Sequence, residues 1–355
     1  MIPDSPTSPP HTSEWRLRAV RPGDGPRILE GFARVNGRAM SEASWRWKLR
    51  TRPATVDNAW IAVDRDERPI FHYAGIPCRL RLPAGTFDAL VVVDLWTLPE
   101  HRRRGVFTRC ARWVHEHWRR GGIAGLLGAP NEQFGSRDRF LGWRHLFPLR
   151  WQIRPLRPEA IVARRLGRPG LGRLRGLGTA WNRLWDRRLP PGIEIRQVGL
   201  DQLAGASWPE ATGWGVERGE PWLRWRYLTC PHHPYRVLAA RCEDRLAGYL
   251  AYRVEEHGGR RFAFVAELVA EEDDSTVTEA LITAVIERLK SAGAVAVATL
   301  AVPSTELYRA FRRRGFVFSW GSFGVQCVPF SGVMDPAVLR DPRCWTFAGG
   351  DLDVI

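Results

Sequence analysis

Residues 98–110, LPEHRRRGVFTRC, have the types and the spacing that phosphate binding requires. Three arginines and a glycine stand between an apolar run and a helical pattern. The first turn of a helix has backbone N–H groups with no partner inside the helix, and its dipole makes that end partly positive. A glycine there lets the backbone approach a phosphate, and arginines present forked donors that match phosphate oxygens. The stretch therefore predicts a pyrophosphate-binding turn, with a solvated arginine surface as the alternative.

The segments around this turn must position it. An apolar run at 89–96, ALVVVDLW, predicts the strand that leads into it. An amphipathic helix begins at Val106 and ends at Gly121-Gly122, and a buried strand follows in IAGLLGAPN. Upstream, the patterns predict a strand at 15–20, helices at 25–37 and 41–50, and strands at 59–63 and 70–77.

The second half of the chain repeats this plan. Trp47, Thr51 and Pro53 recur with the same spacing in the segment 225–231, WRYLTCP. After it the patterns predict strands at 235–241, 246–254 and 261–270, a helix at 276–290 and a closing strand at 294–303. An internal repeat of well over a hundred residues, and hence two related domains, is the economical interpretation.

We therefore expect an α/β protein (α+β, mixed sheet) with two tandem domains, each a central, mostly antiparallel sheet flanked by helices. The predicted boundaries are a loose N-terminus at 1–14, a first domain at 15–153, a linker rich in Arg, Gly and Pro at 154–191, a second domain at 192–330 and a tail at 331–355. The basic linker is expected to be a solvated connector, and peripheral contact with an acidic membrane is the alternative.

Composition narrows the class of protein. With 355 residues and 44% hydrophobic content the chain suits two cores and excludes intrinsic disorder. No run approaches the roughly 20 apolar residues of a membrane span, and the N-terminus lacks the apolar core of a signal peptide, so we expect a cytoplasmic protein. The six cysteines lie far apart, which favours reduced thiols and no metal site. The net charge of +15, almost wholly from arginine, favours polyanionic partners.

The turn resembles the cofactor motif of the GCN5-related N-acetyltransferase (GNAT) superfamily, V-x-P-x-x-R-x-x-G-x-G/A. Thr97, Pro99, Arg102, Gly105 and Phe107 stand at its positions, and Phe107 departs from the usual Gly or Ala. The resemblance is to tandem-domain bacterial acyltransferases with a degenerate second copy, and it implies acetyl-CoA or another acyl-CoA as cofactor. The cofactor-binding residues that it implies are Leu95, Trp96, Thr97, Arg102, Arg103, Arg104, Gly105, Val106, Phe107, Thr108 and Asn131.

The implied reaction moves an acyl group from the CoA thioester to an amine, which needs a base to deprotonate the amine. Asp94, in the fourth predicted strand, is the candidate base, and an Asp satisfied by backbone amides is the alternative. The family's second motif is represented by Asn131 and Gly142-Trp143. Where many members carry an acid Tyr, this chain has Asp138, with Ser136 nearby, so the proton donor is left open between them and water.

The second copy carries ELVAEEDDSTVTEA where the first carries DLWTLPEHRRRGVFTR. Four acids, Glu271 to Asp274, would repel a pyrophosphate, so we expect this domain to have lost cofactor binding. Glu267 falls opposite Asp94 in the repeat and is either an acceptor-site acid or a relic. His72 and Tyr73 could face the acceptor, although a satisfied histidine is the commoner case.

These features predict an acyl-CoA-dependent N-acyltransferase acting on a primary amine of a small molecule, with an amino sugar as one candidate acceptor. One alternative is an aminoacyl transferase of the peptidoglycan-bridge type, whose members lack the R-x-x-G loop present at 102–105. The other is a non-enzymatic polyanion-binding module with a decayed site. A nucleic-acid substrate is not expected, and the oligomeric state is left open.

Overall fold

The computed structural model describes residues 8–49, 56–129, 141–167, 175–199, 202, 208, 213–243, 245–271 and 275–352. The chain divides into two compact units. Unit 1 comprises Met1–Leu146 and Gly324–Arg340, and unit 2 comprises Phe147–Phe323 and Asp341–Ile355. Each unit is a mixed α/β structure with its own hydrophobic core, as the sequence predicted.

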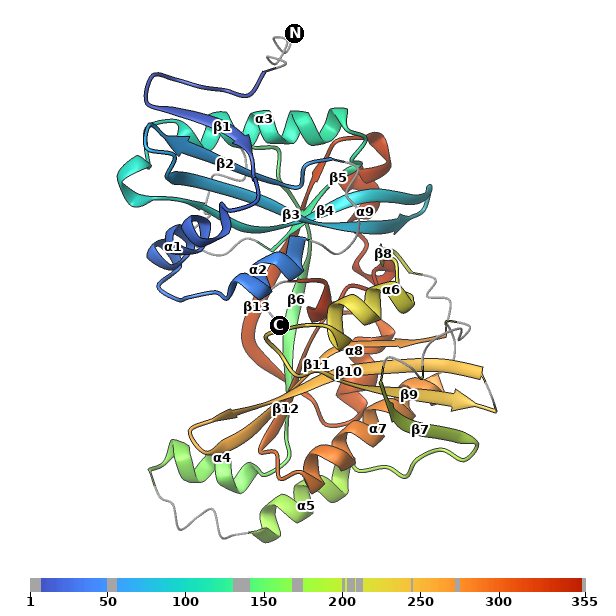
Figure 1. The fold of residues 1–355 in the computed structure, drawn as a ribbon. Helices are drawn as coiled ribbons and strands as arrows, with labels where there is room; N and C mark the ends of the chain where they lie inside the picture. The colour runs from blue at the N-terminus through green and yellow to red at the C-terminus, as the bar shows by residue number, and fades with distance from the viewer. Residues whose placement is uncertain are drawn as a thin grey trace. The chain divides into compact units, whose positions relative to one another are not determined.

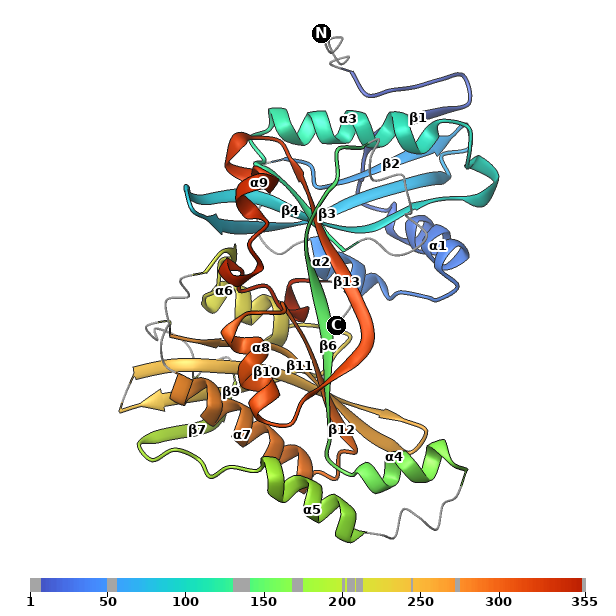
Figure 2. The ribbon, with the colours of Figure 1, turned by 180° about the vertical axis from the view of Figure 1, so that it is seen from behind.

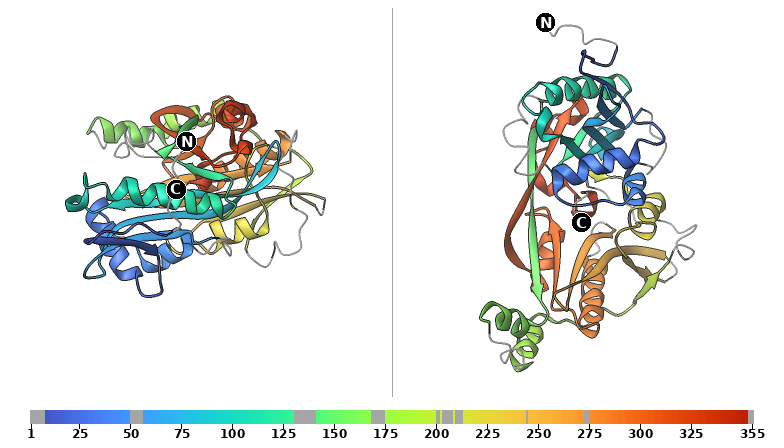
Figure 3. Two further views of the ribbon diagram at one scale, coloured as in Figure 1. Left: turned by 90° about the horizontal axis from the view of Figure 1, so that it is seen from above. Right: turned by 60° about the vertical axis from the view of Figure 1, so that its left-hand side comes forward.

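Unit 1 is built on a sheet in the order β1-β2-β3-β4-β5 (Figure 1). Its strands are β1 (Trp15–Ala19), β2 (Ala59–Asp64), β3 (Pro69–Leu82), β4 (Gly85–Thr97) and β5 (Gly125–Gly128). Neighbouring strands are antiparallel except β4 and β5, which are parallel. Helix α3 (Val106–Arg120) covers one face of the sheet, and α1 (Gly25–Asn36) and α2 (Glu42–Leu49) lie on the other (Figures 1 and 3). A short 3₁₀ turn at Pro99–His101 joins β4 to α3.

Unit 2 repeats this order, with strands β7 (Ile193–Val198), β9 (Arg236–Cys242), β10 (Arg245–His257), β11 (Arg260–Ala270) and β12 (Ala296–Ala301). They pair antiparallel in the order β7-β9-β10-β11, and β12 adds parallel to β11. Helix α7 (Ser275–Ser291) lies across one face of β9, β10 and β11, as the view from behind shows (Figure 2). The remaining helices are α4 (Pro158–Arg165), α5 (Arg175–Trp185), α6 (Glu220–Leu223) with a π-helical turn at Arg224–Leu228, and α8 (Glu306–Arg313).

The last strand of each predicted domain joins the sheet of the other unit. The C-terminal part of β13 (Val317–Pro329) pairs with β5, so it completes the sheet of unit 1. Residues 150–155 of β6 (Arg144–Pro155) pair with β12 and complete the sheet of unit 2. The predicted domain at 192–330 and tail at 331–355 therefore differ from the observed division, in which residues 324–340 belong to unit 1. Residues 154–191, predicted as a linker, belong to unit 2 and contain α4 and α5.

The short elements near the C-terminus are divided in the same way. The 3₁₀ turn at Gly332–Met334 and helix α9 (Pro336–Leu339) belong to unit 1. The 3₁₀ turns at Pro342–Cys344 and Gly349–Asp351 belong to unit 2, and so does β8 (Gly215–Val216).

A bulge and a splay shape the centre of each sheet. In unit 1, Asp94 and Leu95 together face Tyr73 on β3, and the parallel pairing of β4 with β5 ends at Val91. In unit 2, Ala266 is the extra residue opposite β10, and the pairing of β11 with β12 ends at Val265. A bulge bends its strand and increases the local twist. In both units the pairing of the two parallel strands ends before the bulge, and in unit 2 residues 348–352 lie beyond that point.

Candidate active site

The turn from β4 into α3 has the backbone of an anion cradle. Arg103 and Gly105 both have left-handed conformations, with φ of 62° and 76°. Gly105 is the residue before the first turn of α3, and no side chain caps the N–H groups of that turn. A Cβ at Gly105 would meet nothing nearer than Arg109 Cδ at 3.8 Å, so the glycine is required for its φ and not for space. Left-handed residues that precede a helix N-terminus turn successive N–H groups inward, as anion-binding nests do.

Arg102, Arg103 and Arg104 are exposed at this positive helix end. Arg102 Nε donates to the carbonyl of Thr97 at 3.1 Å, which ties the loop to the last residue of β4. Within the described part of the chain none of the three guanidinium groups forms an ion pair with a carboxylate. The turn therefore presents positive charge that the described residues of unit 1 leave uncompensated.

Phe107 occupies the motif position where Gly or Ala is usual, and its ring turns inward. It packs edge to face on Phe71 at 6.3 Å between ring centroids, as part of the unit 1 core. Val106 is likewise buried, and Thr108 is half-buried. The aromatic residue is thus accommodated beneath the turn instead of over it, which removes the steric objection to a phosphate at that position.

Asp94 lies in the bulge of β4 with φ of 51°, a conformation that short polar residues tolerate better than most. Its carboxylate accepts from Lys48 Nζ at 3.1 Å, and both side chains are almost fully buried. Lys48 comes from α2, and sequence reasoning did not connect it to the site. The sequence did contain a signal for Lys48, because Lys48 and Lys290 are the only lysines among 53 basic residues. In the structure each of the two forms an ion pair with an aspartate.

His72 supports the same bulge. Its Nδ1 donates to the backbone carbonyl of Asp94 at 2.7 Å, and its ring stacks on Trp96. Burial lowers the pKa of His72 to about 4, and Lys48 acts in the same direction, so the ring is neutral at pH 7. His72 therefore acts as a positioning group for Asp94.

Tyr73 points to the opposite face of β3, as alternation along a strand requires. Its hydroxyl and His115 Nε2 share a hydrogen bond of 2.7 Å, and its ring packs on Trp118 of α3. Burial raises the pKa of Tyr73 and lowers that of His115 to about 3. The expectation that Tyr73 could face the acceptor was wrong, because the pleat directs it into the core.

The other predicted residues divide into two groups. Leu95, Trp96 and Thr97 form the end of β4 beyond the point where β5 separates from it, and Trp96 is packed against Gly31. Asn131, Ser136 and Asp138 lie outside the described residues. The motif's final pair is described: Gly142 has φ of 80°, and Trp143 is buried against Gly128.

The equivalent strand in unit 2 is engaged with its own chain. Glu267, opposite Asp94 in the repeat, is buried and forms an ion pair with Arg218 at 3.0 Å, while Tyr249 donates a hydrogen bond to it. Arg218 also pairs with Asp351 at 2.7 Å. Burial raises the pKa of Asp351 to about 6, against the opposing effect of Arg218. Glu267 thus belongs to a buried charge network that sequence reasoning did not find.

The C-terminal segment 348–352 lies where β11 and β12 separate. Ala348 bridges to Ala301 at the end of β12, and Gly350 lies against Ala266 in the bulge of β11. Arg226 holds the segment by donating to the carbonyls of Gly350 at 2.7 Å and Leu352 at 2.9 Å. Residues 348–352 therefore fill the gap between β11 and β12 in unit 2.

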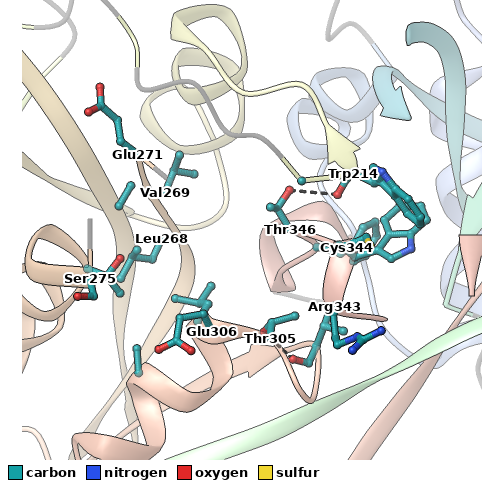
Figure 4. Close-up of a pocket in the computed structure, with 18 of the residues that line it drawn as sticks. Trp214, Leu268, Val269, Glu271, Ser275, Thr305, Glu306, Arg343, Cys344 and Thr346 are labelled. Carbon is teal, nitrogen blue, oxygen red and sulfur yellow. Dashed lines mark hydrogen bonds between the residues drawn. The ribbon is translucent and has the colours of Figure 1, made fainter. Parts of the chain in front are cut away.

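A cavity of about 650 Å³ lies beside this segment, at the carboxyl end of β11 (Figure 4). The cavity is lined by Leu268 of the strand, Glu271 just after it, Ser275 of α7, Glu306 of α8 and the segment 343–347. Its carboxylates are already paired, Glu271 with Arg245 and Glu306 with Arg309 and Arg313. In contrast to the β4–α3 turn, this cavity has no run of uncompensated arginines at a helix end.

Two further findings concern the described residues only. No helix in the described ranges is both long and apolar enough to cross a membrane. No group of three or more His, Cys, Asp or Glu side chains in those ranges is arranged to hold a metal ion.

Comparison with known families bears on the turn directly. Residues 16–145 match the family model described as an acetyltransferase (GNAT) domain. Over these residues the chain is similar to GNAT domains. The match spans the β4–α3 turn, Asp94 and Lys48, and GNAT domains bind acyl-CoA and transfer its acyl group to amine acceptors. No curated protein matches the chain.

Solved structures extend the GNAT fold over most of the chain. A GCN5-related N-acetyltransferase from Anabaena variabilis is 9% identical with a TM-score of 0.63, and the alignment covers 89% of this chain and 73% of that one. A probable N-acyltransferase from Enterococcus faecalis is 12% identical, with a TM-score of 0.63 and coverages of 89% and 72%. A GCN5-related N-acetyltransferase from Kribbella flavida is 15% identical, with a TM-score of 0.58 and coverages of 88% and 70%. At these identities the likeness concerns the fold.

Proposed function

We propose that the protein is an acyl-CoA-dependent N-acyltransferase whose catalytic copy is the GNAT domain of unit 1. The observation that carries the proposal is the β4–α3 turn, where left-handed Arg103 and Gly105 precede an uncapped helix end with exposed arginines. This geometry suits a pyrophosphate, because it combines inward N–H groups, a positive dipole end and forked donors. Acetyl-CoA is the proposed cofactor, and it would supply an activated acyl thioester.

The residues of the turn have distinct proposed roles. The backbone N–H groups from Gly105 to Thr108 and the side chains of Arg103 and Arg104 hold the pyrophosphate. Arg102, anchored to the Thr97 carbonyl, fixes the loop at the end of the strand. The separated edge of β4 from Leu95 to Thr97 offers backbone groups to the thioester carbonyl and the arm that bears it.

Asp94 is the proposed base for the attacking amine. The bulge holds its backbone, the His72 ring fixes its carbonyl, and Lys48 compensates its charge. Because both side chains are nearly buried, the amine would reach the carboxylate only through a bridging water or by displacing Lys48. The proposed proton donor for the leaving thiolate is Asp138, with Ser136 as the second candidate.

The acceptor is proposed to be a primary amine of a small molecule, and an amino sugar is the class to assay first. Unit 2 is proposed to be a degenerate copy that does not bind the cofactor. Two observations support this: its splay is filled by residues 348–352, and Glu271 stands where the first copy begins its basic turn.

Calorimetric titration of acetyl-CoA, and separately of free CoA, tests the proposal. The wild type should bind with a micromolar Kd. Arg102→Ala/Gly105→Ala should lose at least about tenfold in affinity, because it frees the loop from the Thr97 carbonyl and strains the left-handed backbone at position 105 that aims the N–H groups. The matched control is Arg112→Ala/Gly37→Ala. Arg112 is exposed on α3, and Gly37 is left-handed with open space around it, as Gly105 is. No binding by the wild type would overturn the proposal and favour a decayed, non-enzymatic module.

A further inference from the structure

The arginine-rich hairpin, which we define as the described residues 157–167 and 175–189 with helices α4 and α5, belongs to unit 2. Helices α4 and α5 pack side by side (Figures 1 and 3). Trp181 Nε1 donates to the carbonyl of Pro155 at 3.0 Å, and Asn182 Nδ2 donates to that of Leu156 at 2.9 Å. Ala163 and Gly178 are buried on the inner side. The hairpin therefore presents a definite outer surface.

The two acidic residues of the hairpin are either buried or ion-paired. The segment 154–191 contains ten arginines and only two acids, Glu159 and Asp186. Glu159 is buried and faces Gly178. Asp186 is shared by buried Arg154, at 2.7 Å, and Lys290. Asp186 thus attaches the hairpin to β6 and α7, and Glu159 is buried between α4 and α5.

The hairpin carries most of the large apolar side chains that are exposed in the described part of the chain. Six large hydrophobic residues are exposed in the described ranges, and four belong to the hairpin: Val162, Leu166, Leu184 and Leu189, which are 48%, 58%, 65% and 41% exposed. Scattered single leucines need no explanation, but a cluster confined to one element does.

Exposed arginines alternate with these apolar side chains. On α4, Val162, Arg165 and Leu166 are spaced by three and four residues and so share one face. On α5 and its end, exposed Arg183, Arg187 and Arg188 flank Leu184 and Leu189. Arginine buries its apolar stem at an interface while its guanidinium reaches toward charged groups.

We propose that the outer surface of the hairpin docks the protein peripherally on an anionic lipid membrane. Apolar side chains of this size enter the boundary between headgroups and acyl chains, and guanidinium groups pair with anionic headgroups. Charge alone would suit a nucleic acid equally, but recognition of phosphates gives no reason to expose four aliphatic side chains. The proposal is independent of acyl transfer.

Co-sedimentation of the full chain with lipid vesicles tests the proposal. The protein should bind vesicles of equal parts phosphatidylglycerol and phosphatidylcholine, and it should not bind vesicles of phosphatidylcholine alone. Leu166→Ser/Leu184→Ser should weaken the binding by about tenfold or more, because it removes the inserted apolar groups. Val317→Ser/Val338→Ser changes the two large apolar residues that are exposed outside the hairpin in the described ranges, and this variant should bind as the wild type does.

A second variant separates a membrane from other polyanions. Arg183→Gln/Arg187→Gln should weaken vesicle binding and reduce its dependence on salt, whereas Arg112→Gln/Arg38→Gln should not. Thermal melts of all variants confirm that these surface changes leave the fold intact. The proposal is overturned if the wild type ignores anionic vesicles, or if the leucine variant still binds them fully. A result in which only the arginine variant loses binding, and loses single-stranded DNA equally, would assign the surface to nucleic acid instead.

Discussion

Acid should destabilise unit 1 through two buried histidines before most carboxylates are protonated. Burial lowers the pKa of His72 to about 4 and that of His115 to about 3, whereas both return to about 6.5 when the chain unfolds. Below pH 6.5 the unfolded state therefore binds protons that the folded state does not. The stability that these groups contribute is complete above pH 6.5 and is lost as the pH falls towards 4.

The size of the stability loss follows from the difference between the pH and the pKa of the histidines in the unfolded chain. Each pKa unit corresponds to about 1.4 kcal/mol, so lowering the pH to 5 costs about 2 kcal/mol for each histidine. Together the two cost about 4 kcal/mol, which is a large share of the 5–15 kcal/mol typical of a whole domain. Hydrogen exchange of β3 and α3 peptides, measured by mass spectrometry between pH 5 and 8 with correction for intrinsic rates, reports this loss locally.

Two variants isolate the cause. His72→Asn keeps a donor for the Asp94 carbonyl, and His115→Gln keeps a partner for the Tyr73 hydroxyl, yet neither new side chain titrates. The double variant should lose about 4 kcal/mol less than the wild type between pH 7 and 5. Exposed His257→Gln in unit 2 controls for the substitution itself. If the double variant shows the same pH slope as the wild type, the buried histidines do not govern acid stability.

Three further substitutions test the packing of the two sites. Lys48→Met leaves the Asp94 carboxylate buried without its cation and should cost about 3–5 kcal/mol in urea unfolding, and Lys48→Met/Asp94→Asn should recover much of that loss. Gly31→Ala would place a Cβ 2.4 Å from the Trp96 ring, so the melting temperature should fall by several degrees, and an unchanged value would show that the helix can shift freely. Arg218→Met removes the common partner of buried Glu267 and Asp351, so carboxypeptidase should remove the C-terminal segment at least about tenfold faster. Equal rates would show that these ion pairs do not hold the segment in place.

The local features of the site could be read from the sequence because their causes are local. Hydrophobic periodicity and two glycines predicted a helix from Val106 to Gly121, and the structure places α3 at Val106–Arg120 with Gly121 at its end. The bulge residue Asp94 was recognisable because a carboxylate interrupts an apolar strand. The family model matches residues 16–145, which include the motif at 97–107 that carried the predicted resemblance.

Tertiary structure decided the features that depend on residues distant in the chain. The pairing of β13 with β5 and of β6 with β12 joins segments that no repeat boundary predicts, because a strand's hydrogen bonds do not depend on sequence distance. Neither the Lys48 partner of Asp94 nor the inward turn of Phe107 is visible in the spacing.

Unit 2 shows the same division most clearly. Its acids suggested from sequence that a phosphate would be repelled. The structure adds a second observation in favour of the proposed loss of cofactor binding. Residues 348–352 occupy the gap between β11 and β12, and Arg218 binds both Glu267 and Asp351. Sequence determined which elements form and where charge accumulates, since helices, turns and side-chain charges are local properties. Which buried charges compensate one another, and which chain segment fills a gap, was settled only by packing.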